Sequence, residues 1–132
     1  MADVVVEQAV RLLVTSSSLR LINGRAYKGP LQSIPNPVYP CIVLQRPAPG
    51  IADRNAPYGT WPLFVTHYSK LSYDQTWALY ELSNALLQDW ALTIAGRGFC
   101  LRRQGEPIEA FDDDGGEAYY MSTVTYWVRQ IG

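Results

Sequence analysis

Three consecutive aspartates, Asp112 to Asp114, have the clearest potential for chemistry, as metal ligands or as an acid–base pair. A calcium loop needs oxygen ligands at alternating positions and a bidentate glutamate that closes the loop. Here the acids are adjacent, so their side chains would diverge, and Glu117 comes too early to close a loop. Gly115 and Gly116 follow the aspartates and favour a turn, because glycine tolerates positive φ. We expect a solvated acidic turn between two strands; a weak cation site and a pair of catalytic carboxylates are the alternatives.

His67 is the single histidine of the chain, and Ser69 lies on the same side of the surrounding segment. A serine nucleophile needs a sharp Gly-x-Ser-x-Gly turn and an acid that orients the histidine, and neither accompanies His67. A zinc site needs further His or Cys residues at ligand spacing, which are also missing around it. We therefore expect His67 to have a structural or surface role.

Cys41 and Cys100 are far apart and are flanked by apolar residues. This predicts free thiols buried in strands, with a disulfide or a metal pair as the alternative. No glycine-rich phosphate-binding motif is present in the sequence. The sequence thus predicts no catalytic residue, no metal ligand and no cofactor.

The composition is that of one globular domain spanning residues 1–132. A formal net charge of −1 and a single adjacent basic pair, Arg102-Arg103, argue against tight binding to phosphate backbones. The apolar start is interrupted at Glu7, which does not fit a signal peptide. No apolar run approaches the roughly 20 residues of a membrane span. We expect synthesis in the cytoplasm.

Hydrophobic periodicity and turn residues predict helix, two or three strands, long helix and two strands, in that order. The first helix is expected over residues 3 to 14 and the long helix from residue 72 to about 91. The expected strands are residues 41–46, 60–69, 99–104 and 118–130. This order is typical of an α+β protein with one mixed or antiparallel sheet, on which an N-terminal helix and one long helix pack.

The long helix is the expected centre of the core. Ser72 and Gln75 have the spacing of a capping box, which would fix the start of the helix. One stripe of the helix is expected to face the sheet and another to face solvent. The sheet-facing stripe would consist of Leu79, Leu82, Leu86 and Trp90, and the solvent-facing stripe of Asp74, Glu81, Asn84 and Gln88.

Two segments rich in proline and glycine, residues 22–40 and 47–59, are long for so small a domain. Rigid loops of this kind typically contact other chains. At the second loop, apolar anchors and one pair of opposite charges would form an interface, with a solvated and mobile insertion as the alternative. The candidate interface residues are Ile51, Asp53, Arg54, Tyr58 and Trp61.

Three stretches of the chain resemble the tail terminator, or tail completion, proteins of long-tailed bacteriophages. The resemblance covers most of residues 4 to 130 and rests on element order and hydrophobic spacing. The stretches are "YPCIVLQRP" (39–47), "LFVTHYSK" (63–70) leading into "SYDQTWALYELSNALL" (72–87), and "GFCLRRQGEPIEAFDDDGGEAYYMSTVTYWV" (98–128).

The resemblance implies an α+β subunit of a ring, usually a hexamer, that caps the tail tube and offers a surface to the head or neck. The implied partners are further copies of the chain, the tail tube protein and head–tail connector or neck proteins, with DNA sliding through the lumen without specific binding. It implies a virion protein that is not an enzyme and needs no cofactor.

The sequence departs from the family at "THYSK", where relatives often carry a tryptophan, and in its proline-rich loop 47–59. These departures leave a neck or head-completion ring as an alternative. Two rivals come from other classes: a monomeric binding module that uses the aromatic surface, and a small hydrolase or nuclease-like enzyme that uses Asp112 to Asp114.

Overall fold

A six-stranded sheet in the order β1-β2-β3-β6-β5-β4 forms the body of the protein. The computed structural model describes residues 2–46, 60–113 and 118–131. Among the described strands, β1 and β2 run parallel and the other neighbouring pairs are antiparallel. The elements in chain order are α1 (Ala2–Thr15), η1 (Ser17–Ile22), β1 (Ala26–Lys28), η2 (Leu31–Ser33), β2 (Cys41–Gln45), β3 (Thr60–Ser69), α2 (Tyr73–Leu87), β4 (Ala91–Ile94), β5 (Arg97–Asp112) and β6 (Tyr119–Gln130).

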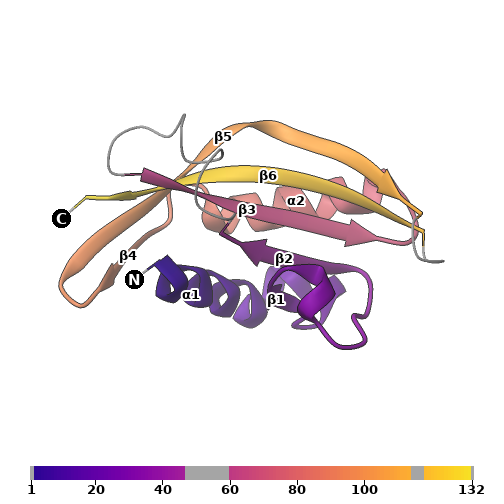
Figure 1. Cartoon of the computed structure of the whole chain (residues 1–132), viewed down its shortest axis with the longest axis horizontal. Coiled ribbons are helices and arrows are strands. Elements are labelled where there is room, and N and C mark those ends of the chain that lie inside the picture. The colour runs from indigo at the N-terminus through magenta and orange to yellow at the C-terminus, as the bar shows by residue number, and fades with distance from the viewer. Residues whose placement is uncertain (1, 47–59, 114–117, 132) are drawn as a thin grey trace.

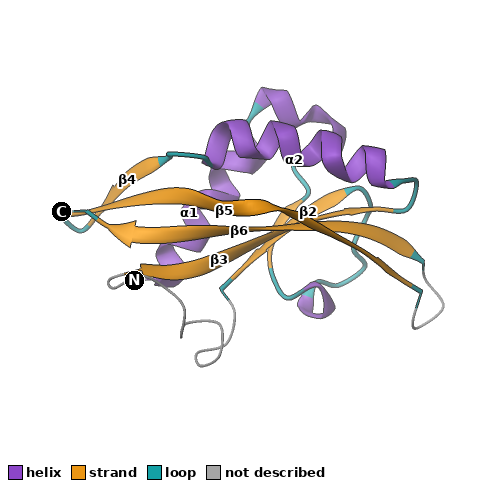
Figure 2. Cartoon of the chain, turned by 90° about the horizontal axis from the view of Figure 1, so that it is seen from above, coloured by secondary structure: helices purple, strands orange, loops and turns teal. Residues whose placement is uncertain are grey.

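Both helices cover the same face of the sheet (Figures 1 and 2). α1 packs on β1 and β2, whereas α2 packs on β3 and β6. The core lies between the helices and the sheet, and its α1 residues recur at helical spacing, as at Val5, Ala9 and Leu13. This arrangement confirms the expected class, an α+β fold with a mixed sheet and two helices packed on it.

Alternation along the central strands separates the two faces of the sheet. The buried residues of β6 lie under the helices, and the residues between them are half-buried on the opposite face. These buried residues are Ser122, Val124, Tyr126 and Val128. In β3, Leu63, Val65 and His67 share the helix-covered face and pair in register with β6.

α2 begins where the capping box predicts. Ser72 Oγ accepts a hydrogen bond from the Gln75 backbone N–H at 3.2 Å. The Gln75 side chain does not return to Ser72 but accepts a hydrogen bond from the Ser69 hydroxyl. The end of β3 and the start of α2 are therefore joined by side chains, which fixes the direction in which the helix leaves the sheet.

The predicted sheet-facing stripe of α2 is only partly right: Leu79 is buried and Trp90 packs against the core, but the rest of the stripe is misplaced. Leu82 is 36% exposed and Leu86 is half-buried, while Asn84 and Gln88, expected in solvent, point toward the sheet. The buried residues of the helix are Thr76, Leu79, Tyr80, Ser83 and Leu87. The buried side of α2 is rotated relative to the predicted stripe, because the sheet supplies hydrogen-bond partners for polar side chains of the helix. The most apolar side of α2 is therefore not the side that is buried.

The expected extension of the long helix to residue 91 is also wrong. α2 ends at Leu87, and Asp89 adopts φ 61°, a left-handed conformation that helices do not continue through. The chain then forms β4, which the sequence did not predict, and turns back into β5 through Ala95 and Gly96, both at positive φ. β5 extends to Asp112, well beyond the predicted end at residue 104.

The proline-rich segment before β2 crosses the face of the sheet that the helices leave open. Gly29 donates its N–H to the Leu44 carbonyl at 2.9 Å. A Cβ atom at Gly29 would collide with Val43 Cγ1, so glycine suits this close approach. Tyr39, at the end of the segment, stacks on Tyr119 of β6. Cys41 and Val43 are therefore buried on this face, beside the buried Thr66 of β3.

Candidate interaction surface

His67 is fully buried, between the sheet and α2. Its Nδ1 lies 3.0 Å from the Ser122 carbonyl oxygen, which can only accept, so Nδ1 carries the proton. Nε2 of the neutral ring then accepts a hydrogen bond from the Ser83 hydroxyl at 2.6 Å. Burial lowers the pKa of His67 to about 4. A serine–histidine pair is thus present, but no substrate can reach it, and its role is structural as expected. Sequence reasoning missed Ser83, which comes from another element.

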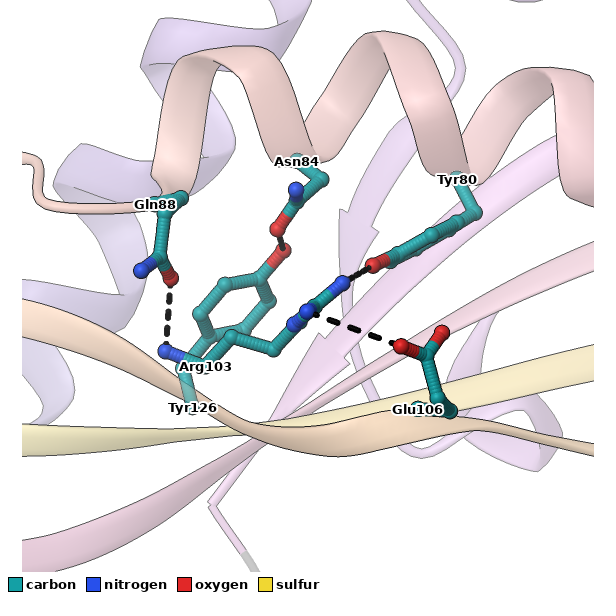
Figure 3. A network of polar contacts seen from close by, with 6 residues as sticks. All are labelled: Tyr80, Asn84, Gln88, Arg103, Glu106 and Tyr126. Atoms are coloured by element: carbon teal, nitrogen blue, oxygen red, sulfur yellow. Dashed lines mark hydrogen bonds and ion pairs between the residues drawn. The ribbon is translucent and has the colours of Figure 1, made fainter.

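A second polar network joins α2 to the sheet (Figure 3). The Tyr126 hydroxyl donates to Asn84 Oδ1 at 2.7 Å, and the Arg103 backbone N–H donates to Gln88 Oε1 at 2.7 Å. The Arg103 guanidinium donates to the Tyr80 hydroxyl and lies 3.7 Å from Glu106. Through these contacts, the polar groups of α2 are hydrogen-bonded to polar groups of β5 and β6. The contacts hold the helix in the rotated orientation described above.

Asp112, the first residue of the acidic stretch, belongs to β5 and pairs with Tyr119 of β6. The Tyr119 hydroxyl donates to Asp112 Oδ2 at 3.0 Å. Asp113 is exposed, and Asp114 and Glu117 lie outside the described residues. In the part of the chain that the structure describes, no three His, Cys, Asp or Glu side chains are grouped as metal ligands. Asp112 is thus a cross-strand contact at the end of the hairpin.

Replacing Asp112, Asp113 and Asp114 with asparagine should leave the fold intact. Asparagine keeps a side-chain oxygen that can accept the Tyr119 hydrogen bond, so we expect the melting temperature to change by less than about 2 °C. Adding EDTA to the wild-type protein should leave its melting temperature unchanged. A drop of several degrees with EDTA, measured by circular dichroism, would instead reveal a structural metal ion.

The sheet face opposite the helices carries half-exposed aromatic rings beside threonines. Tyr68 and Tyr119 meet edge to face across β3 and β6, with ring centroids 5.4 Å apart. At the same end of the sheet is a shallow hollow of about 520 Å³, partly lined by Val38, Tyr39 and Leu71. Val38 and Leu71 are 54% and 74% exposed. This surface offers apolar contact area, with Lys70 and Gln75 also lining the hollow.

Of the predicted interface residues, only one lies in the described part of the chain. Trp61, in β3, is half-buried against the core, with the Arg46 guanidinium 5.5 Å from its ring centroid. The predicted loop contact itself lies outside the described residues, as do four of its residues, Ile51, Asp53, Arg54 and Tyr58. Sequence reasoning missed Ile108 and Phe111, which are 74% and 50% exposed in β5. The sequence signal for these two residues is a large apolar side chain that stands among acidic residues within a strand.

Comparison of the sequence with protein-family models and with curated proteins finds no match. Among the described residues, no helix has the length and apolar character that crossing a membrane requires. Both thiols are free in the structure: Cys41 is buried in β2 and Cys100 is half-buried in β5, and two other strands lie between them.

Proposed function

We propose that this chain is a structural virion protein resembling phage tail terminators, and that it forms a ring that caps the tail tube and joins it to the head or neck. The order of the elements carries the proposal. After an N-terminal helix, the chain forms a proline-led strand, then β3 leading directly into α2, and then a long β5–β6 hairpin. The last three of these correspond to the three stretches that carry the resemblance.

The chemistry of the described side chains supports a structural role. His67 is buried and held neutral by its surroundings, so it cannot act as a base on an external substrate. Burial raises the pKa of the Cys41 thiol to about 11, which keeps it protonated and unreactive at neutral pH. His67 and Cys41 are thus both placed for packing.

The proposed partners are further copies of the chain, usually six in such rings, the tail tube protein on one side and a connector or neck protein on the other. DNA would pass through the lumen without specific binding. The formal net charge of −1 supports this, because a strongly basic lumen would hold the phosphate backbone. No cofactor is required.

Native mass spectrometry of the purified protein should detect a ring. A hexamer has six times the chain mass of 14.8 kDa, about 89 kDa. Electron microscopy should then show the particles at the ends of purified tail tubes. A protein that stays monomeric at micromolar concentration, and leaves tube ends bare, would contradict the proposal.

Two alternatives give different results in the same assay. A neck or head-completion ring would bind the connector and leave the tube ends free. A monomeric binding module remains a candidate because of the half-exposed aromatic face and the hollow beside Tyr39, which fit a protein ligand. Such a module would give a single species at the monomer mass.

A further inference from the structure

We propose that copies of this chain associate head to tail, with the acidic outer edge of β5 in one copy against the basic edge formed by α1, η1 and β1 in the next. The inference rests on the proposed ring function, since it identifies the contact that would build the ring. Charge distribution, strand order and exposure support it independently.

Charge is divided unevenly along the chain. Residues 8 to 52 contain five bases, Arg11, Arg20, Arg25, Lys28 and Arg46, and no acid. Residues 104 to 128 contain six acids, Glu106, Glu109, Asp112, Asp113, Asp114 and Glu117, and no base. The net charge near zero therefore conceals two segments of opposite sign, which is the condition for electrostatic attraction between copies.

The strand order places these two segments at opposite edges of the sheet. β1 is one edge strand, with α1 packed beside it, whereas β5 lies on the other side of the central pair of β3 and β6. Figure 1 shows β5 along the upper side of the molecule and α1 with β1 along its lower side. Opposite charges on opposite edges favour a head-to-tail contact between copies of the chain, which each further copy can repeat.

The acidic edge is the second half of β5. β4 pairs with Arg97–Cys100, and the chain before β4 covers Leu101 and Arg103 by backbone and side-chain hydrogen bonds. Beyond Gln104, no strand in the described part of the chain lies along the outer side of β5. A strand edge of this length is normally covered or protected against pairing.

The side chains along this half of β5 combine negative charge with apolar surface. Glu106 has 73% of its side chain exposed, and Glu109, as well as Asp113 directly after the end of β5, is also exposed. Between them, Ile108 and Phe111 expose 74% and 50% of their surface. Acids and Pro107 disfavour pairing with an arbitrary strand, while the apolar residues supply contact area once a basic partner is in place.

The basic edge is formed by the segment from α1 to β1. Arg11 on α1 and Arg20 on η1 are exposed. Lys28 on β1 lies 3.3 Å from Glu7 and keeps 41% of its side chain exposed. Bases outnumber acids here, so the edge keeps an excess positive charge.

These edges select the symmetry of the assembly. A twofold dimer through either edge would place like charges opposite each other, which is unfavourable. Joining unlike edges gives a heterologous contact, and such contacts generate rings when the rotation between copies closes. The acidic β5 edge of one copy therefore binds the basic edge of a second copy.

Charge reversal on each edge tests the contact. One variant carries Glu106→Lys and Asp113→Lys, and the other carries Arg11→Glu and Arg20→Glu. Each variant alone should lose the assembly seen for the wild type, with self-association weakened about tenfold or more, because its two edges now have the same sign. An equimolar mixture should restore assembly, with equal numbers of the two variants in each particle.

Native mass spectrometry resolves these species, because the variants differ in mass. Asp74→Lys with Glu81→Lys on the exposed side of α2 changes the net charge by the same amount as the first variant, and this control should assemble like the wild type. Thermal melts of all variants verify that each one folds.

The outcomes separate this contact from the ring function. If the wild type forms rings and both edge variants form them equally well, the contact is wrong and the ring function stands. If folded variants lose assembly but the mixture does not restore it, the pairing of the two edges is also wrong. A wild type that is monomeric at every concentration overturns the ring and the contact together.

Discussion

Lowering the pH from 7 to 4 is expected to remove about 3 kcal/mol of stability through His67 alone. The pKa of the buried imidazole is about 4 in the folded protein, against an ordinary value of 6.5. Between these two pKa values, His67 binds a proton in the unfolded chain but not in the folded protein. The contribution of the neutral imidazole to the free energy of unfolding is therefore complete above pH 6.5 and is lost as the pH falls toward 4. At about 1.4 kcal/mol per pKa unit, the interval corresponds to about 3 kcal/mol.

His67→Gln isolates this contribution. Glutamine offers a donor for the Ser122 carbonyl and an acceptor for the Ser83 hydroxyl, but it does not titrate. Urea unfolding of both proteins at pH 7, 5.5 and 4 gives the difference in unfolding free energy at each pH, and carboxylates common to both proteins cancel. We expect the advantage of the wild type to shrink by about 3 kcal/mol over this range. Parallel pH curves would show that the imidazole titrates alike in the folded and unfolded chains.

Leu79→Ala should destabilise the protein by about 2–5 kcal/mol, the range for truncating a fully buried leucine. Leu79 is 0% exposed and belongs to the core between α2 and the sheet. The alanine variant loses the apolar contacts and leaves a cavity that the rigid sheet cannot fill by moving. Urea unfolding at pH 7 measures the change.

Leu82→Ala is the matched control. It makes the same chemical change three residues further along the same helix, where the side chain is 36% exposed. We expect a cost below about 1 kcal/mol, since little packing is removed. Equal costs for the two variants would show that the orientation of α2 differs from the one described.

Local patterns were sufficient to predict most of the elements. The Ser72 cap, the alternation along β3 and the apolar run of β2 each depend on residues close in sequence, and each lies where expected. The rotation of α2 could not be predicted, because Ser83 and Asn84 face the sheet only when their partners on β3 and β6 are in place. Those partners are fixed by tertiary structure.

The candidate interaction surface was predicted less well for the same reason. An edge is a property of strand order, and this order inserts β6 between β3 and β5, two strands separated in sequence by α2 and β4. No local signal identifies Glu106 or Ile108 as an edge residue. β1 and β4 are three and four residues long, too short for a periodic pattern to stand out from the neighbouring turns.

The central position of β6 has a consequence for the order in which the protein folds during synthesis. β3 pairs with β6 from Thr60↔Arg129 to Ser69↔Tyr120, so its partner leaves the ribosome about 60 residues after it. Until β6 has emerged, the strands β1–β3 and the strands β4–β5 form two separate parts of the sheet, because β6 is the strand that pairs with both β3 and β5. The apolar residues of β3 and β5 then lack the neighbouring strand beside which they pack. Pairing of such distant segments is slow, because chain entropy must be lost before the contacts form. The nascent chain therefore completes its sheet in one late step, when residues 119–130 have emerged and can enter between the two parts.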